Sequence, residues 1–167
     1  MICYDPCDRS TRTVLGNLIY PNGVCRTSDR LSLLFAETWV RRVNRYWFDW
    51  TKRGNVEEVL VKPGNPDNIK RLLDSSYGVA LVGTRGPARD LALTKPAFRK
   101  RMTRQVALAN WPFLNINTGC VIKFTERGEI LGTYRDLRGH NHPMVTSVTE
   151  HTEYLYLGGV ANNRVGK

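Results

Sequence analysis

Two short motifs of this sequence place an oxygen-bearing side chain directly after a proline. The first is Tyr20-Pro21-Asn22-Gly23-Val24, and the second is Asn65-Pro66-Asp67-Asn68-Ile69. Asn22 and Asp67 carry amide and carboxylate oxygens, which hard metal ions accept as ligands. The two residues lie 45 positions apart, about the length of one four-stranded propeller blade. The repeat predicts polar side chains at equivalent places in two successive blades.

Three other sets of polar residues have a structural explanation that we favour over a catalytic one. Neighbouring residues of a strand point to opposite faces, so the pair Glu150-His151 is expected to support a turn. The segment His140-Asn141-His142 has the His-x-His pattern of some metal sites, but we expect it in a solvated loop. Glu37 follows an apolar run and is expected to pair with Arg42, although a channel-lining role stays open.

The rest of the chain is predicted to consist mainly of short strands. Alternating or continuous apolar runs between turn signals predict them at 2–5, 11–15, 31–36, 42–48, 56–61, 66–69, 78–83, 119–124, 130–136, 145–148 and 154–160. The alternation in 42–48 is typical of an outer strand. The aromatic residues Tyr46, Trp47 and Trp50 are expected to pack between blades.

The strand pattern breaks between residues 85 and 112. Leu91, Phe98 and Met102 fall near helical spacing there, which predicts one or two short helices. The formal net charge is +10, from 25 Lys and Arg against 15 Asp and Glu, and the segment 85–111 alone holds seven basic residues and one acidic residue. Peripheral membrane contact and a solvated helix are the two alternatives for its basic residues, which are Lys95, Arg99, Lys100, Arg101 and Arg104. No nucleic-acid-binding motif accompanies the charge, so no nucleic-acid partner is expected.

Length and composition limit the other possibilities. A chain of 167 residues with 41% hydrophobic residues is long enough for one domain with a core. Its four cysteines are too scattered for a disulfide framework or a zinc site, so free thiols are expected. No apolar run reaches the roughly 18 residues of a membrane span, and no secretory signal follows Met1. The sequence leaves the compartment open.

Together the motifs resemble the strictosidine synthase-like proteins, six-bladed propellers of the calcium-dependent phosphotriesterase and lactonase superfamily. The matching segments are 4–6, 20–24, 36–38 with Arg42, 45–47, 66–71 and 145–158. The resemblance implies an all-β fold, a partial six-bladed β-propeller of about three blades with a short helical insert near 85–112. It implies that residues 1–167 are the C-terminal half of such a protein, with blades that start near 20, 65 and 143.

The resemblance also implies a function. Asn22, Asp67 and Asn68 match asparagine and aspartate positions that bind a central calcium in propeller lactonases, and the remaining ligands would lie in the missing N-terminal half. The implied activity is hydrolysis of small-molecule esters or lactones at that calcium. Two alternatives stay open. The polar residues are also ordinary turn formers. The alternative to an enzyme is a non-catalytic propeller fragment or interaction module.

Two positions depart from the true strictosidine synthases. The catalytic glutamate of those enzymes is Thr146 here, and a nearby active-site histidine is Met144. A threonine hydroxyl does not titrate in a useful range and cannot shuttle a proton. The expected chemistry is therefore not alkaloid condensation, and no catalytic residue is assigned from the sequence. The helical insert matches a segment that can cover the channel mouth in relatives.

An open propeller has a physical consequence for association. A ring that is not closed leaves blade faces and strand edges uncovered, and such surfaces favour association with other chains. We therefore expect self-association through the open blade edges.

Overall fold

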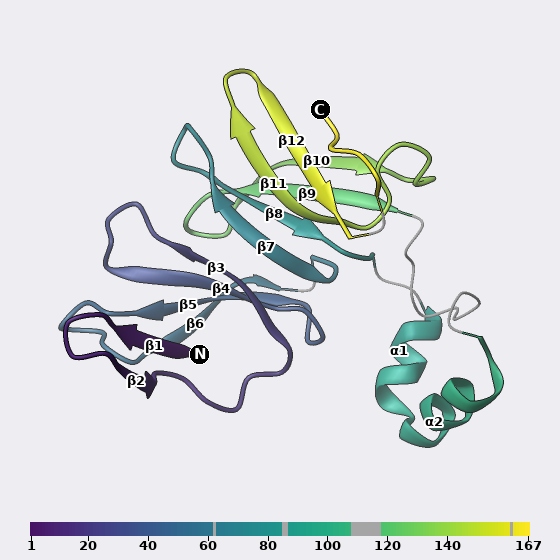
Figure 1. Cartoon of the computed structure of the whole chain (residues 1–167), viewed down its shortest axis with the longest axis horizontal. Coiled ribbons are helices and arrows are strands. Elements are labelled where there is room, and N and C mark those ends of the chain that lie inside the picture. Colours follow the sequence, from purple (N-terminus) through teal and green to yellow (C-terminus); the bar gives the residue numbers. More distant parts are fainter. Residues whose placement is uncertain (62, 85–86, 108–117, 161) are drawn as a thin grey trace.

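The computed structural model of the chain describes residues 1–61, 63–84, 87–107, 118–160 and 162–167. Within these ranges the strands form four antiparallel sheets, two with four strands and two with two strands (Figure 1). Each sheet joins strands that follow one another in the chain, as the blades of a propeller do. The fold is thus a partial β-propeller, which confirms the expected all-β class.

The first four-stranded sheet has the order β3-β4-β5-β6. Its strands are β3 (Pro21–Arg26), β4 (Ser32–Glu37), β5 (Arg42–Trp47) and β6 (Val56–Val61). The expectation that 42–48 is an outer strand is wrong, because β5 pairs with β4 on one edge and with β6 on the other. The alternation there reflects two buried faces, and each face carries a polar side chain, Asn44 on one and Arg45 on the other.

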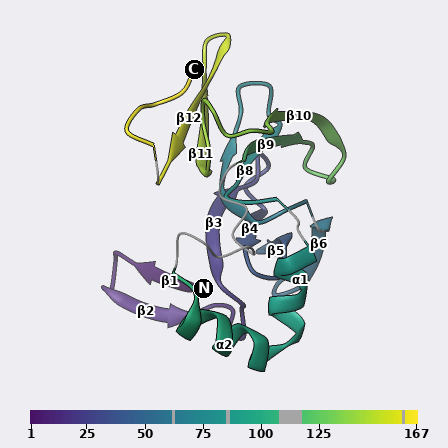
Figure 2. The ribbon, with the colours of Figure 1, turned by 90° about the vertical axis from the view of Figure 1, so that its right-hand side faces the viewer.

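The second four-stranded sheet contains the helical insert. Its strands are β7 (Pro66–Arg71), β8 (Tyr77–Leu81), β9 (Gly119–Phe124) and β10 (Ile130–Asp136). The helices α1 (Pro87–Thr94) and α2 (Pro96–Gln105) lie between β8 and β9 in the chain. They stand to one side of the sheets in Figure 1 and face the viewer in Figure 2. They confirm the predicted helical insert, of which residues 85–86 and 108–112 lie outside the described residues.

Two hairpins flank the four-stranded sheets. The first joins β1 (Ile2–Asp5) to β2 (Ser10–Thr13), and the second joins β11 (Val145–His151) to β12 (Tyr154–Gly159). Leu157 of β12 also exchanges two backbone hydrogen bonds with Gly166, so the C-terminal segment adds a short third partner to this hairpin.

The two central strands of the second sheet, β8 and β9, are buried on both faces. One face of β8 and β9 packs against the first sheet in a core that includes Val79, Leu81 and Ile122. The opposite face packs Ala80 and Val121 against β11. Because successive side chains of these strands point to two buried faces in turn, their sequences are continuous apolar runs. At the edge of the first core, the fully buried Tyr77 donates its hydroxyl to Glu126 and accepts from the Ser28 N–H.

The first strands of successive blades lie side by side. β3 contacts β7, and β7 contacts β11, as the innermost strands around a propeller axis do. Gly23 makes the closest of these approaches possible. A Cβ on Gly23 would lie 2.4 Å from the Asp67 carbonyl oxygen, so a larger residue would push the two strands apart.

Candidate functional site

The candidate ligands Asn22, Asp67 and Asn68 lie together where β3 and β7 begin. The Asn22 side-chain amide lies near enough to the Asp67 carboxylate to lower its pKa. Asn68 Nδ2 lies 3.3 Å from Asp67 Oδ1 and donates at 2.9 Å to the Thr146 carbonyl oxygen of β11. The first strands of three successive blades therefore meet at these residues, although they are distant in the sequence.

Thr38 connects this group across two blades. Its hydroxyl donates to the Pro66 carbonyl at 2.7 Å and accepts from Asn22 Nδ2 at 3.3 Å. Its backbone N–H donates to the Tyr20 carbonyl at 3.1 Å. One buried side chain thus fixes the segments that carry Asn22 and Asp67. The sequence analysis assigned no role to Thr38, because this role depends on a contact with a residue 28 positions away.

Asp67 is a buried carboxylate without a basic partner. It is 9% exposed. Burial raises its pKa, and the hydrogen bond from Asn22 opposes that rise only in part. No lysine or arginine of the described residues contributes to this balance. A buried carboxylate normally pairs with a cation or binds a metal ion, so the Asp67 environment favours a bound cation.

The three side chains fit calcium as an incomplete ligand set. Calcium takes six to eight oxygens, mainly from carboxylates, amides, carbonyls and water, and these residues offer one carboxylate and two amide groups. The described residues hold no group of three or more His, Cys, Asp or Glu side chains that could hold a metal ion. The asparagine amides are therefore essential to the hypothesis, and further oxygens must come from outside this trio.

The two asparagines are not equally free to become ligands. In this structure both amide nitrogens face the Asp67 carboxylate, and rotation of each amide would present its oxygen instead. Rotation of Asn22 exchanges only weak contacts, since its bond to Thr38 is 3.3 Å long. Rotation of Asn68 would direct its oxygen at the Thr146 carbonyl, to which it now donates at 2.9 Å. Asp67 and Asn22 are thus the better candidates, and Asn68 is equally well explained as a link between β7 and β11.

Thr146 itself contributes its backbone to this group. Its carbonyl accepts the bond from Asn68, and its hydroxyl lies 3.4 Å from the Gly158 carbonyl of β12. Met144, two residues earlier, has a positive φ of 50° and donates its N–H to Thr118. Neither side chain offers a titratable group, so Asp67 is the one ionisable residue among those named at this site.

Glu37, the last residue of β4, has a structural role, as expected. Glu37 is fully buried and accepts hydrogen bonds from Arg42 Nε at 2.7 Å, Asn44 Nδ2 at 2.8 Å and the Ile19 N–H at 2.8 Å. Burial alone would raise its pKa, but these bonds lower it below the ordinary value. The predicted pair with Arg42 is confirmed, and Glu37 also fixes the loop that leads to Asn22.

The other predicted polar sets are separate from the site. Glu150 accepts the Leu73 N–H at 2.6 Å, which confirms its turn-supporting role, while the His151 ring packs near Tyr156. His140 is exposed. His142 has a buried Nδ1 with no hydrogen-bond partner, and its ring contacts the C-terminal segment at Gly166.

The aromatic residues behave differently from one another. Tyr46 is buried as expected. The Trp47 ring contacts the cations of Arg45 and Lys52, which are 4.9 Å and 4.4 Å from its ring centre. The expectation that Trp50 packs between blades is wrong, because it is 86% exposed at the turn between β5 and β6.

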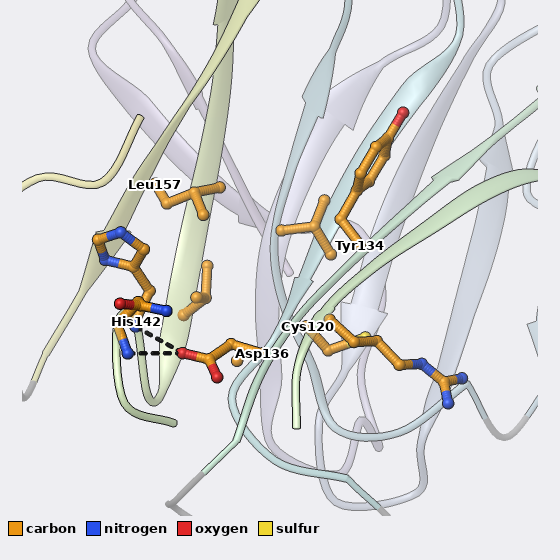
Figure 3. Close-up of a pocket in the computed structure, with 10 residues that line it drawn as sticks. Cys120, Tyr134, Asp136, His142 and Leu157 are labelled. Atoms are coloured by element: carbon orange, nitrogen blue, oxygen red, sulfur yellow. Dashed lines mark hydrogen bonds between the residues drawn. The ribbon is translucent and has the colours of Figure 1, made fainter. Parts of the chain in front are cut away.

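The cavity drawn in Figure 3 lies away from the candidate ligands. It has a volume of about 220 Å³, lies between β9–β10 and the β11–β12 hairpin, and is mainly apolar. Asp136 on its wall accepts the N–H groups of Asn141 and His142, and these bonds lower its pKa. Burial raises the pKa of the Cys120 thiol, so this cysteine stays protonated. The Asp136 carboxylate of this cavity is thus engaged in backbone hydrogen bonds, and the Cys120 thiol is unreactive. The cavity is not an evident catalytic site.

All four cysteines are free, and Cys120 is the buried one. In the described part of the chain, neither helix has the length and apolar character of a membrane span.

Comparison with known proteins identifies a group of relatives. The family model for strictosidine synthase matches residues 1–51. Protein strictosidine synthase-like 13 of Arabidopsis thaliana is 30% identical over 99% of this chain and 39% of its own length. Strictosidine synthase-like 3 of the same plant is 28% identical over 94% of the chain. The adipocyte plasma membrane-associated protein of Gallus gallus is 27% identical over 93% of the chain.

A solved structure supports the fold. Catalytically inactive virginiamycin B lyase from Staphylococcus aureus, determined with quinupristin, superposes with a TM-score of 0.56. It covers 94% of this chain and 40% of the lyase at 16% sequence identity, a likeness that concerns the fold alone. The sequence matches confirm the resemblance stated above. The chain spans about two fifths of the length of these relatives, and its assignment to their C-terminal half stays a prediction.

Proposed function

We propose that this chain supplies part of a calcium centre, because it resembles the strictosidine synthase-like proteins over nearly its whole length. In this proposal the complete propeller hydrolyses small-molecule esters or lactones, and Asp67 and Asn22 are ligands of the calcium. Asn68 is a third, weaker ligand. The activity belongs to the whole propeller, of which the chain spans about two fifths of a relative's length.

One observation carries the proposal. Asp67 is a buried carboxylate with a raised pKa, no basic partner among the described residues and two asparagine amides beside it. A purely structural carboxylate would be expected to resemble Glu37, whose arginine partner and three hydrogen bonds lower its pKa. The contrast between these two buried acids of one chain favours a cation at Asp67.

The residues around the site have distinct roles in this proposal. Calcium bound there would polarise the carbonyl of an ester or lactone and stabilise the negative charge that develops on its oxygen. Asp67 would balance the charge of the ion, and Asn22 would offer its amide oxygen. Thr38 holds the two strands in position through its bonds to Pro66 and Asn22. None of these residues supplies a proton shuttle, so the acid or base must lie elsewhere in the propeller.

A non-catalytic propeller module is the second candidate, and a specific observation favours it. The Asn68 bond to Thr146 and the Thr38 bond to Pro66 both join one blade to the next. Asn68 and Thr38 therefore have a complete structural explanation as joints between blades. In that case calcium would not change the stability of the protein.

Thermal unfolding with a calcium titration separates the two candidates. A ligand present at 100 times its Kd stabilises a folded protein by about 2.7 kcal/mol, which corresponds to roughly 5 to 10 °C in Tm for a chain of this size. We expect such a rise for the wild type and none for Asp67→Ala. Magnesium serves as the control ion, since it demands a tighter octahedral site. Ester and lactone assays follow a positive result. An unchanged Tm in both proteins would mean that this chain does not bind calcium, and the hydrolytic proposal would then be rejected.

A further inference from the structure

Helix α2 presents positive charge that no acidic side chain of the described residues neutralises. From Lys95 to Gln105 the sequence contains five basic residues and no acidic residue. The neighbouring α1 has one acidic residue in the same hairpin, Asp90, and it pairs with Arg41 of the first blade at 2.6 Å. No residue of α2 is buried, and the helix stands away from the sheets (Figure 1). The charge is thus available to an external partner.

Part of this charge gathers around one shallow hollow. Lys100, Arg101 and Arg104 line it together with Ala97 and Gln105. Arg101 donates to Gln105 Oε1 at 2.9 Å, which holds these two side chains together at the rim. Arg99 is directed instead to α1, where it donates to the Ala92 carbonyl. Three cationic side chains around a solvent-filled hollow match the geometry and charge of a phosphate group.

We propose that α2 docks the protein on an anionic membrane surface, with Lys100, Arg101 and Arg104 in contact with lipid phosphate and carboxylate headgroups. A cluster of basic side chains on a projecting helix is attracted to anionic lipid at about 1 kcal/mol per residue. Nucleic acid is the less favoured partner. Proteins bind single-stranded nucleic acids through aromatic side chains that stack on the bases. In the described part of the helical hairpin the aromatic residue is Phe98, and it is half-buried, so it is poorly placed to stack on a base.

This contact would orient the propeller. The helical hairpin leaves the second sheet after Leu81, and Leu81 pairs with Pro66 at the start of β7. Asp67 therefore lies at the same end of the sheet as the hairpin. Docking through α2 would direct that end of the molecule toward the bilayer. The docking proposal does not depend on calcium at Asp67 or on any catalytic activity.

Vesicle co-sedimentation of the full chain tests the proposal. We expect binding to vesicles of 70% phosphatidylcholine and 30% phosphatidylserine at low salt, loss of binding at high salt, and none to pure phosphatidylcholine. The variant Lys100→Gln/Arg101→Gln/Arg104→Gln should reduce the partition coefficient about 100-fold. The matched control Arg12→Gln/Arg127→Gln/Arg138→Gln removes the same charge from exposed positions elsewhere and should bind within a fewfold of the wild type. Circular dichroism and Tm establish that both variants are folded.

Three outcomes would overturn the proposal. Equal loss in the two triple variants would mean that net charge alone, and not α2, drives the association. Competition by millimolar inorganic phosphate at constant ionic strength would indicate a receptor for free phosphate and not a membrane surface. Tighter binding to single-stranded RNA than to the anionic vesicles, abolished by the α2 variant, would assign the helix to nucleic acid.

Discussion

At the scale of single residues, two buried acids of this protein have opposite electrostatics. Glu37 has an arginine and two further donors, and its pKa is lowered. Among the described residues, the polar partners of the Asp67 carboxylate are asparagine amides, and burial raises its pKa. A carboxyl whose pKa is raised by folding binds its proton more tightly in the native state, so it destabilises the native state as the pH rises through that raised pKa. Asp67 is therefore expected to oppose folding at neutral pH when no cation is bound.

This difference leads to a prediction for Asp67→Asn. The variant keeps the shape of the side chain but has no charge to bury. In a calcium chelator, the Tm difference between variant and wild type should be small near the ordinary pKa of 3.8 and should grow in favour of the variant toward pH 7. Saturating calcium should reverse the order at pH 7, since only the wild type would bind the ion. Thermal scans from pH 4 to 8 measure both effects. A variant that is less stable than the wild type in chelator at pH 7 would contradict the argument.

The residues of the candidate site were predictable only in part from the sequence. Asn22 and Asp67 stand out because both follow a proline in a repeated motif. The pairing of Glu37 with Arg42 was predictable because a hairpin brings both ends of its strands together, and they are indeed partners in register. Thr38 was not predictable in its role, since its partner Pro66 lies in the next blade. Trp50 was misassigned because its size suggested burial, whereas its turn position leaves it in solvent.

At the scale of elements, the candidate site depends on how closely β3 approaches β7. Gly23 permits that approach, because a Cβ there would lie 2.4 Å from the Asp67 carbonyl and 2.6 Å from two further backbone atoms. These backbone atoms belong to β7 and can move aside only if the strand itself moves. The β3–β7 contact is thus the element-level feature on which both the calcium site and the blade packing depend.

We therefore expect Gly23→Ala to destabilise the protein by about 1 to 3 kcal/mol, the usual cost of overpacking a tight contact. It should also weaken any calcium effect, because Asn22 and Asp67 would move apart. Gly16→Ala is the matched control. A Cβ at Gly16 meets nothing within 4 Å, so this change should be neutral or stabilising by up to about 1 kcal/mol. Urea unfolding of both variants measures the difference. Equal stability of the two variants would show that the β3–β7 contact is looser than described.

The strands β8 and β9 were well predicted, and the reason is that both of their faces are buried. Continuous apolar runs such as Val79–Leu81 face neighbouring blades on both sides, which makes each strand a clear signal. The misread strand, β5, carries Asn44 and Arg45 on buried positions. Polar residues that alternate with apolar ones normally indicate a face exposed to solvent. Here they are buried because they have polar partners, and some of these partners are distant in the sequence, as Glu126 is for Arg45.

At the scale of the whole molecule, an apolar groove remains open beside the first sheet. It has a volume of about 250 Å³ and lies between the β1–β2 hairpin and the first sheet. Its walls include Ile2, Val24 and Phe48, which are 72%, 51% and 41% exposed. In a closed propeller each such face packs against a neighbouring blade. Exposed apolar side chains that line one groove are a typical contact surface.

This groove predicts concentration-dependent self-association of the chain when it is studied by itself. Burial of apolar surface at about 25 cal/mol per Å² makes even a few such side chains sufficient for weak association. Sedimentation velocity between about 1 and 100 µM should show a rising weight-average mass, because typical weak complexes populate in this range. Ile2→Lys/Val24→Lys should keep the protein monomeric, whereas Ile130→Lys/Leu131→Lys, at an exposed site on β10, should not. Association blocked equally by both pairs would assign it to nonspecific hydrophobic contact. A monomer at every concentration would mean that the groove is too small to bind a second copy.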